Sequence, residues 1–511
     1  MPETLEKLRS IVTDPGLSPA QKARFLSLEA ENMLPYPKID DAVAEALAEG
    51  VLCDLAEGHA PYKPRYVVPD YAVLLKNGSA YLELDPPETL DEAITCLMIA
   101  WHHVPSVTAM PVFIGHIDRL LLPFCEGVGD EDLRAKLRLL WRYIDRVLPD
   151  AFLHVNIGPE DNRVARAVLD VDSELKQIAP NLTLLYDPET SGEALLRRAT
   201  DAIITCSKPH VANHPLHTAA FDARGYAIVS CYNALPLAGG AATLVRLNLH
   251  EAAKRATDTA DFADNVLPRY MDLQFRLIEA RMGHLFEHSG FFENFIVTEG
   301  WVDRDRFTAM FGIYGMAEAV NHLQDLEGRA GRYGLDAEAN ALGLGITRAL
   351  ADRVEATPVE HAWRGQAMLH AQAGISTDID ATPGVRIPYG SEPDPVTHVM
   401  ALAPHHLHYP SGVSEILTID ETVKANPRAL FTLAKGALAS GFRDFTANVA
   451  GGDLVRVTGY MIRLSDLEKF RQDGGSRTNT TALGAEAAEL TRILERKPRV
   501  IGHEFAHGYG Q

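Results

Sequence analysis

The chain has 511 residues, of which 46% are hydrophobic, and it carries a formal net charge of −21. This length suits one large α/β barrel with insertions, and the apolar content is enough for a large core. The negative charge repels the phosphates of nucleic acids and of anionic membranes, so we expect neither as a partner. A small anion in a local basic pocket stays compatible with it.

The cysteines are few, scattered and odd in number: Cys53, Cys96, Cys125, Cys206 and Cys231. They form neither a disulfide framework nor a Cys-x-x-Cys pair, which favours a reducing cytoplasm. Residues 1–9 lack the apolar core of a secretory signal. Residues 225–245 are uncharged, but polar residues, a proline and two glycines interrupt them, so we interpret them as buried interior rather than a membrane span.

Helices dominate the expected structure of residues 1–100. Ser18 and Gln21 have the spacing of a capping box, with Pro19 at the first helical position, and the pattern continues to about residue 34. Residues 41–57 are a second expected amphipathic helix, which Gly58 ends.

From about residue 109, strand-like apolar segments alternate with helical ones. The expected strands include residues 110–114, 152–157, 182–186 and 227–232, and the expected helices include residues 192–202 and 251–288, with a break at Pro268. Residues 383–395 are an expected loop. The alternation predicts an α/β fold.

A cysteine ends one of these strands. Residues 227–233 read as a short buried strand that reaches Cys231, and Gly239-Gly240 and an apolar segment at 244–249 follow it. A thiol on such a loop has an S–H bond strong enough for its thiyl radical to abstract hydrogen from carbon.

The run Arg456-Val457-Thr458-Gly459-Tyr460 supplies a matching partner. An unpaired electron on a glycine α-carbon is delocalised between the amide nitrogen and the carbonyl, and a side chain would twist that carbon out of plane. Taken alone, the run also fits an ordinary bend or bulge in an alternating strand.

These two segments, together with residues 311–319, resemble the glycyl radical enzymes in sequence and order. We identify the chain as a member of the YjjI-type glycine radical enzyme family, with a more distant similarity to the anaerobic ribonucleotide reductases. The resemblance implies that Gly459 stores a radical and that Cys231 becomes a thiyl radical. That radical would abstract hydrogen from a small polar substrate, hydroxylated or phosphorylated, under anaerobic conditions.

The resemblance also implies the architecture and the partner. It predicts a ten-stranded barrel of two antiparallel five-stranded half-barrels surrounded by helices. Residues 1–100 would be the helical N-terminal part, 101–450 the barrel, 451–475 the radical loop and 476–511 a tail. An oxygen-sensitive radical S-adenosylmethionine activase with an iron–sulfur cluster would install the radical on Gly459. The sequence leaves open whether the protein forms a homodimer.

Ribonucleotide reduction remains an alternative activity, although the chain departs from the reductase pattern. Reductases of this class usually carry four zinc-binding cysteines close to the radical glycine, whereas no cysteine follows Cys231 here. We also recognise no nucleotide-binding regulatory segment at the N-terminus, and we expect no bound metal.

The densest polar cluster supplies the candidate substrate contacts His405, His408, Tyr409, Ser411 and Gly412. It lies where the anaerobic reductases carry a Tyr-Thr-Asn-Ser turn, and it departs from that turn at two positions. An expected helix or turn at 413–416 would offer free N–H groups to an anion. The alternatives are a metal site, with histidines two apart on a strand, or an ordinary loop.

Three further residues have two interpretations each. Glu318 begins an expected helix, where it either favours the helix dipole or accepts a hydroxyl proton from the substrate. Asn213 is another candidate substrate contact. Cys206, after the strand-like residues 202–205, is either a buried structural cysteine or a second redox sulfur that faces Cys231.

The tail contains His503, Glu504 and His507 in the order of a zinc peptidase motif. On a helix the two histidines would share one face. The motif lies four residues from the end of the given sequence, and Gly502, Gly508 and Gly510 disfavour a helix. A surface tail is the competing interpretation, and the one we favour.

Overall fold

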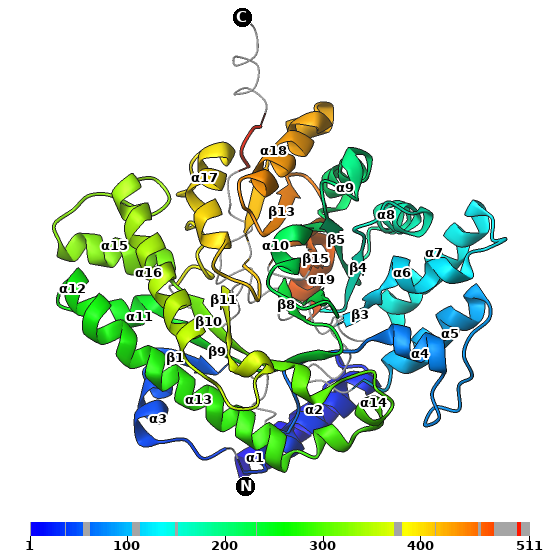
Figure 1. Cartoon of the computed structure of the whole chain (residues 1–511), viewed down its shortest axis with the longest axis horizontal. Helices are drawn as coiled ribbons and strands as arrows, with labels where there is room; N and C mark the ends of the chain where they lie inside the picture. Colours follow the sequence, from blue (N-terminus) through cyan, green and yellow to red (C-terminus); the bar gives the residue numbers. More distant parts are fainter. Residues whose placement is uncertain are drawn as a thin grey trace, which may run out of the picture.

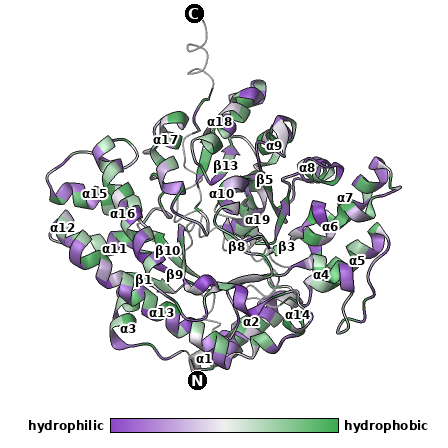
Figure 2. Ribbon diagram, in the orientation of Figure 1, coloured by the Kyte–Doolittle hydropathy of each residue, from purple (hydrophilic) through white to green (hydrophobic). Residues whose placement is uncertain are grey.

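The computed structural model describes residues 2–35, 37–54, 62–104, 113–148, 152–230, 232–371, 381–413, 415–457, 461–474 and 498–501. Two sheets occupy the middle of the molecule and helices surround them (Figure 1). Figure 2 shows that the outer helices carry both hydrophilic and hydrophobic residues, as expected for amphipathic helices between solvent and a core. The α/β class is confirmed.

The first sheet has five strands in the order β1-β9-β10-β11, with β2 also paired to β9. Strands β9, β10 and β11 are parallel, whereas β1 and β2 run antiparallel to β9. The bounds are β1 Leu52–Asp54, β2 Tyr66–Val68, β9 Gly239–Asn248, β10 Phe307–Tyr314 and β11 Met368–Ala371.

The second sheet has six strands in the order β12-β13-β6-β5-β4-β3. Strands β3 to β6 are parallel, β13 is antiparallel to β6, and β12 is parallel to β13. The bounds are β3 Phe113–His116, β4 His154–Ile157, β5 Asn181–Tyr186, β6 His210–Asn213, β12 Ile416–Ile419 and β13 Asp444–Val449.

Two hairpins lie beside the sheets. Strands β7 Tyr226–Val229 and β8 Asn233–Pro236 form one, and β14 Leu454–Arg456 and β15 Met461–Arg463 form the other. A parallel bridge between Ala371 and Val413 links the end of β11 to the segment that enters β12. Among the described residues no pairing closes these mixed sheets, so the expected ten-stranded barrel is not confirmed.

The helices complete the outer layer. Their bounds are α1 Pro2–Thr13, α2 Pro19–Asn32, α3 Asp41–Ala48, α4 Tyr71–Asn77, α5 Leu90–Trp101, α6 Ile117–Leu121, α7 Asp130–Val147, α8 Arg163–Leu175, α9 Gly192–Cys206, α10 His214–Thr218, α11 Leu249–Ala253, α12 Thr259–Asp261, α13 Leu267–His288, α14 Phe295–Thr298, α15 Met316–Leu326, α16 Ala337–Ala356, α17 Pro395–His406, α18 Pro427–Ala439 and α19 Leu464–Asp473. None of the helices in the described ranges is long and apolar enough to cross a membrane.

Several local expectations are confirmed and others are wrong. Ser18 and Gln21 form the predicted capping box of α2, and α13 begins next to Pro268. The helix expected at 41–57 ends at Ala48, because the chain turns at Gly50, with φ +72°, and Leu52–Asp54 pairs with β9. The strand expected before Cys206 is the last turn of α9, where tertiary packing decides between the two states.

The segment of residues 409–413 packs tightly on the β7–β8 hairpin. Gly412 has φ +107°, and a Cβ at this position would overlap the carbonyl oxygen of Tyr232. Glycine is therefore required here by both conformation and space. This contact and the Ala371–Val413 bridge place the segment between the end of β11 and the hairpin.

We expect Gly412→Ala to lower the free energy of unfolding by about 2–4 kcal/mol, because strain and overlap act together. The control is Gly390→Ala, where φ is +88° but no atom lies within 4 Å of the added Cβ. It should cost about 1 kcal/mol. Urea unfolding followed by circular dichroism measures both, and equal losses would contradict the close packing of this turn.

Candidate functional site

The loop that carries Cys231 joins β7 to β8. Cys231 itself lies outside the described residues, but Ser230 and Tyr232 on either side are buried and have φ values of +46° and +64°. Both values lie in the left-handed region, which non-glycine residues occupy only where the surroundings enforce it. The backbone around Cys231 is therefore held in an unusual conformation.

Strand β4 holds this hairpin through two buried side chains. Asn156 donates to the carbonyl of Ile228 and accepts from its N–H, each at 2.8 Å. His154 Nδ1 lies 3.1 Å from the carbonyl oxygen of Ser230. These contacts position the residue that directly precedes Cys231.

The loop that carries Gly459 joins β14 to β15. Arg456 pairs with Met461, and Thr458, Gly459 and Tyr460 lie outside the described residues. Val457 is buried. Asn448 donates to the carbonyl of Arg456 and accepts from its N–H, each at 2.8 Å, so β13 fixes the start of the loop.

The flanks of the two loops touch. The Cζ atom of Arg456 lies 5.5 Å from the centre of the Tyr232 ring, and the Arg456 side chain is fully buried. Its Nη2 donates to the carbonyl of Ser207 at 3.2 Å and its Nη1 to Oδ1 of Asn181 at 3.4 Å. Gly459 is three residues from Arg456 and Cys231 one residue from Tyr232, so the structure brings together residues that flank the two predicted radical positions.

Ser411 and Gly412 lie against the same hairpin. The Ser411 carbonyl accepts from the N–H of Ala234 at 3.0 Å, and its hydroxyl donates to the Ala234 carbonyl at 3.1 Å. The expected helix start after Gly412 is wrong, because Val413 pairs with Ala371 and β-branched residues continue as β12. Among residues 411–413 and 415–419, which the structure describes, no helix begins that could bind an anion.

The side chains of His405 and Tyr409 form a buried cluster with α16. His405 Nδ1 is 2.8 Å from the Thr347 hydroxyl, and the Tyr409 hydroxyl is 3.1 Å from it. His405 lies in the last turn of helix α17 rather than on a strand. His408 lines a separate cavity of about 480 Å³ with Arg443, so the histidines do not converge on one point.

Asn213 and Glu318 both have structural partners. The Asn213 side chain donates to the carbonyls of Leu438 and Phe442 at 3.0 and 3.1 Å. Glu318 accepts from the N–H and hydroxyl of Thr382, and burial raises the pKa of its carboxyl. Each residue ties a neighbouring segment in place.

Cys206 packs against the β14–β15 hairpin. Its side chain packs in an apolar cluster with Ile178, Leu454 and Met461. Burial raises the pKa of its thiol to about 12, which keeps the less reactive thiol form. This environment agrees with a structural cysteine.

The sequence interpretation missed a buried polar face of the second sheet. Residues on four adjacent strands contribute to it: His154, Asn156, Asn181, Thr183, His210, Asp444 and Asn448. A signal was present, because polar residues alternate with apolar ones in 154–157, 181–184 and 444–449, and alternate residues of a strand share one face. The motif at His503, Glu504 and His507 lies outside the described residues.

Arg456→Lys should lower the free energy of unfolding by about 2–3 kcal/mol, because lysine replaces a planar fork that bonds two partners and stacks on Tyr232. Arg463→Lys on β15 is the control, since within the described part of the chain that side chain donates to an exposed carbonyl, of Lys176. Chemical denaturation checks this. A loss at Arg456 no greater than at Arg463 would mean that the guanidinium does not fasten the two loops.

Burial lowers the pKa of His405 to about 3. This value lies below the unfolded-state pKa of about 6.5, so the stabilisation by neutral His405 is complete above about pH 6.5 and is lost as pH falls toward 3. When the pH falls from about 7 to about 5.5, the wild type should therefore lose on the order of 1 kcal/mol more of its free energy of unfolding than His405→Gln does. The control is His288→Gln at an exposed histidine, and identical pH dependence in both variants would contradict the buried neutral imidazole.

Known proteins provide an independent comparison. Residues 17–499 match the family model described as glycyl radical enzyme YjjI-like. The chain is 56% identical to protein YjjI of Escherichia coli (strain K12) over 507 residues, which cover 99% of this chain and 98% of that protein.

Solved structures agree at the level of the fold. The Thermotoga maritima anaerobic ribonucleotide reductase in complex with dATP and CTP has a TM-score of 0.69 at 12% identity, covering 92% of this chain and 94% of that one. A Roseburia inulinivorans structure for 1,2-propanediol dehydration has a TM-score of 0.72 at 13% identity, covering 97% and 89%. The family predicted from the motifs is confirmed: the chain belongs to the YjjI-like family of glycyl radical enzymes.

Proposed function

We propose that Gly459 stores a radical and that Cys231 uses it to abstract a hydrogen atom from a small polar substrate. In the first step the Cys231 S–H bond breaks and its hydrogen atom moves to the Gly459 α-carbon. The thiyl radical then takes a hydrogen atom from a substrate C–H bond. After the substrate radical rearranges, the product radical takes the hydrogen atom back from the Cys231 S–H bond. The thiyl radical formed again then takes a hydrogen atom from the Gly459 α-carbon, which restores the glycyl radical.

The contact between Arg456 and Tyr232 is the observation that carries this proposal. Hydrogen atom transfer requires the donor and acceptor atoms in near contact, within roughly 3–5 Å. Two loops from distant parts of the sequence have their flanking side chains packed together, which supports such an approach of Gly459 and Cys231. The complete ten-stranded barrel that would enclose them is part of the same proposal.

The polar face beside the Cys231 loop supports a hydroxylated substrate. Buried hydroxyl, amide and imidazole groups provide donors and acceptors for hydroxyl groups. Ser411 and Gly412 are the proposed substrate contacts that lie at the hairpin. The other candidates would influence the substrate indirectly, through the segments that they hold in position: His405, His408, Tyr409, Glu318 and Asn213. We therefore propose elimination from a diol as the reaction, with ribonucleotide reduction as the alternative.

A partner has to install the radical. Family membership implies a glycyl radical, and we propose a radical S-adenosylmethionine activase as its source, acting in the cytoplasm without oxygen. Thr458 and Tyr460 would move with Gly459 when the loop opens to this partner. Arg456, which is fully buried, would stay as the fixed end of the loop.

Anaerobic co-expression with the cognate activase, followed by electron paramagnetic resonance, tests the two roles. Cys231→Ala should keep the organic radical and lose turnover at least 1,000-fold, on the order seen when an essential nucleophile is removed. Gly459→Ala should show no persistent radical. Turnover is measured on 1,2-propanediol, other small diols and ribonucleotides, which separates elimination from reduction.

Cys206→Ala is the matched control, because it makes the same substitution at another cysteine, which is buried. It should keep both the radical and turnover. Full activity of Cys231→Ala would refute the thiyl assignment, and a persistent radical in Gly459→Ala would refute the radical store.

A further inference from the structure

A continuous row of hydrogen-bonding groups runs from the Cys231 loop to Asp444. The Ser230 carbonyl oxygen is 3.1 Å from His154 Nδ1, and His154 Nε2 is 2.6 Å from the Thr183 hydroxyl. The same hydroxyl is 2.9 Å from His210 Nδ1, and His210 Nε2 is 3.0 Å from Asp444 Oδ1. These side chains are all fully buried, and we call them the histidine chain.

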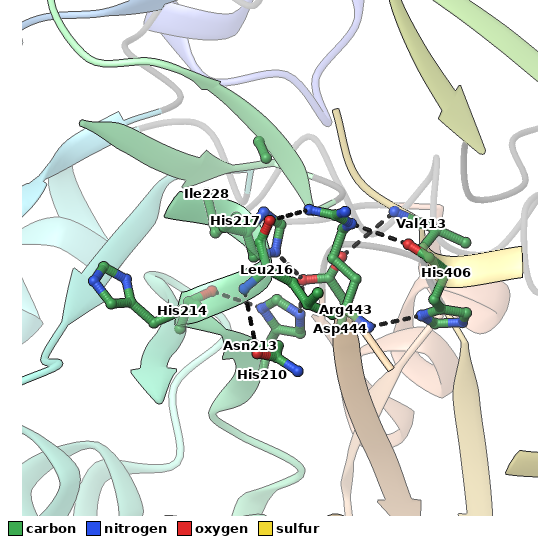
Figure 3. A network of polar contacts seen from close by, with 12 residues as sticks. His210, Asn213, His214, Leu216, His217, Ile228, His406, Val413, Arg443 and Asp444 are labelled. Carbon is green, nitrogen blue, oxygen red and sulfur yellow. Dashed lines mark hydrogen bonds and ion pairs between the residues drawn. The ribbon is translucent and has the colours of Figure 1, made fainter. Parts of the chain in front are cut away.

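Asp444 ends the chain as an acceptor. Its Oδ1 is also 3.0 Å from Nε2 of His217, and its Oδ2 accepts from the N–H of Val413 at 3.4 Å (Figure 3). Three donor groups thus surround the carboxylate, and the pKa of Asp444 is lowered by His217 and His210, which outweigh its burial. Asp444 is therefore ionised at neutral pH.

In a neutral histidine chain, the number of contacts exceeds the number of available protons by one. Four contacts need four hydrogens. Three are hydrogen bonds, and in the fourth His210 Nε2 lies against the Asp444 carboxylate as an ion pair, which requires a proton on that nitrogen. A neutral His154, a neutral His210 and the Thr183 hydroxyl supply three, and both ends, the Ser230 carbonyl and the Asp444 carboxylate, are acceptors only. A neutral chain would leave one buried acceptor facing another, which is costly away from water.

We infer that the histidine chain holds a fourth proton, as an imidazolium shared between His154 and His210, and that this proton fixes the carbonyl of Ser230 next to Cys231. With the extra proton every link has one donor and one acceptor. The charge of the imidazolium is balanced by Asp444 within the same chain.

The surroundings of the histidine chain act on the pKa values of His154 and His210 in both directions. Burial lowers the pKa of both His154 and His210, and the cations Arg456 and Lys208 act in the same direction on His154. Asp444 raises the pKa of His210 through direct contact. His217 also faces Asp444, and the cation Arg443 directly precedes β13. Asp444 is therefore the group on which the imidazolium depends.

The consequence for activity rests on the proposed function. His154 and Thr183 act as positioning residues: they hold Ser230, and Ser230 orients the sulfur of Cys231 toward the substrate and Gly459. The protonation state itself does not depend on any radical, so it is tested in the unactivated protein.

The direct test is nitrogen-15 NMR of histidine-labelled full-length protein at neutral pH, with His154→Gln and His210→Gln for assignment. In the wild type we expect one imidazolium, with both ring nitrogens protonated, shared between these two positions. Asp444→Asn should abolish it, because the amide N–H groups can donate to His210 and His217 while its oxygen accepts from Val413, which satisfies all four links with neutral rings. Two neutral histidines in the wild type would overturn the proposal.

Thr183 provides a matched pair in case the Asp444 variant does not fold. Thr183→Ser keeps the hydroxyl link and should keep the imidazolium, whereas Thr183→Val breaks the chain at nearly constant volume and should abolish it. In the activated enzyme, Thr183→Val should keep the radical signal and lower kcat about tenfold with KM within about twofold, and Thr183→Ser should restore kcat. An imidazolium that persists in Thr183→Val overturns the shared chain. Loss of the imidazolium with unchanged kcat would refute its positioning role alone. Failure of the Cys231→Ala experiment would instead count against the proposed function.

Discussion

The buried guanidinium of Arg456 against the ring of Tyr232 joins two loops from distant parts of the sequence. Radical transfer as a hydrogen atom acts only over contact distance, so a glycyl radical enzyme has to bring its glycine and its cysteine together. In this protein the residues that flank the two proposed radical positions are held from both sides. Asn448 holds the backbone of Arg456, and Asn156 holds the hairpin that contains Tyr232.

Holding these loops requires many polar groups inside the protein, where an unsatisfied donor or acceptor costs about 1–3 kcal/mol. The second sheet meets this requirement by turning one polar face of β4, β5, β6 and β13 toward the hairpins. The histidine chain is the most demanding part of that face, because its two ends are both acceptors. A site built in this way is rigid around Ser230 and Tyr232, which suits an enzyme that has to direct a reactive sulfur to a single C–H bond.

The α/β alternation and the family could be predicted from the sequence, because both depend on local patterns and short runs of recognisable residue types. The Ser18–Gln21 capping box and the alternating strands are examples, and the Arg456–Tyr460 run is recognisable by its order of residue types. The helix expected after Gly412 failed because Val413 and the isoleucines of β12 pair with neighbouring strands, a choice made by tertiary contacts. The partners of His154 and Asp444 were out of reach for the same reason, since they join strands that are distant in the sequence.

The proximity of Gly459 and Cys231 is the central claim, and pulsed electron–nuclear double resonance measures it directly. The activated protein is produced with cysteine deuterated at the β-carbon, and the deuterium coupling to the glycyl radical is recorded in the wild type and in Cys231→Ala. We predict a coupling that corresponds to a separation of roughly 3–5 Å between the radical carbon and the sulfur, and its loss in the variant. A radical signal with no deuterium coupling in the wild type would show that the two residues lie apart and would contradict the account.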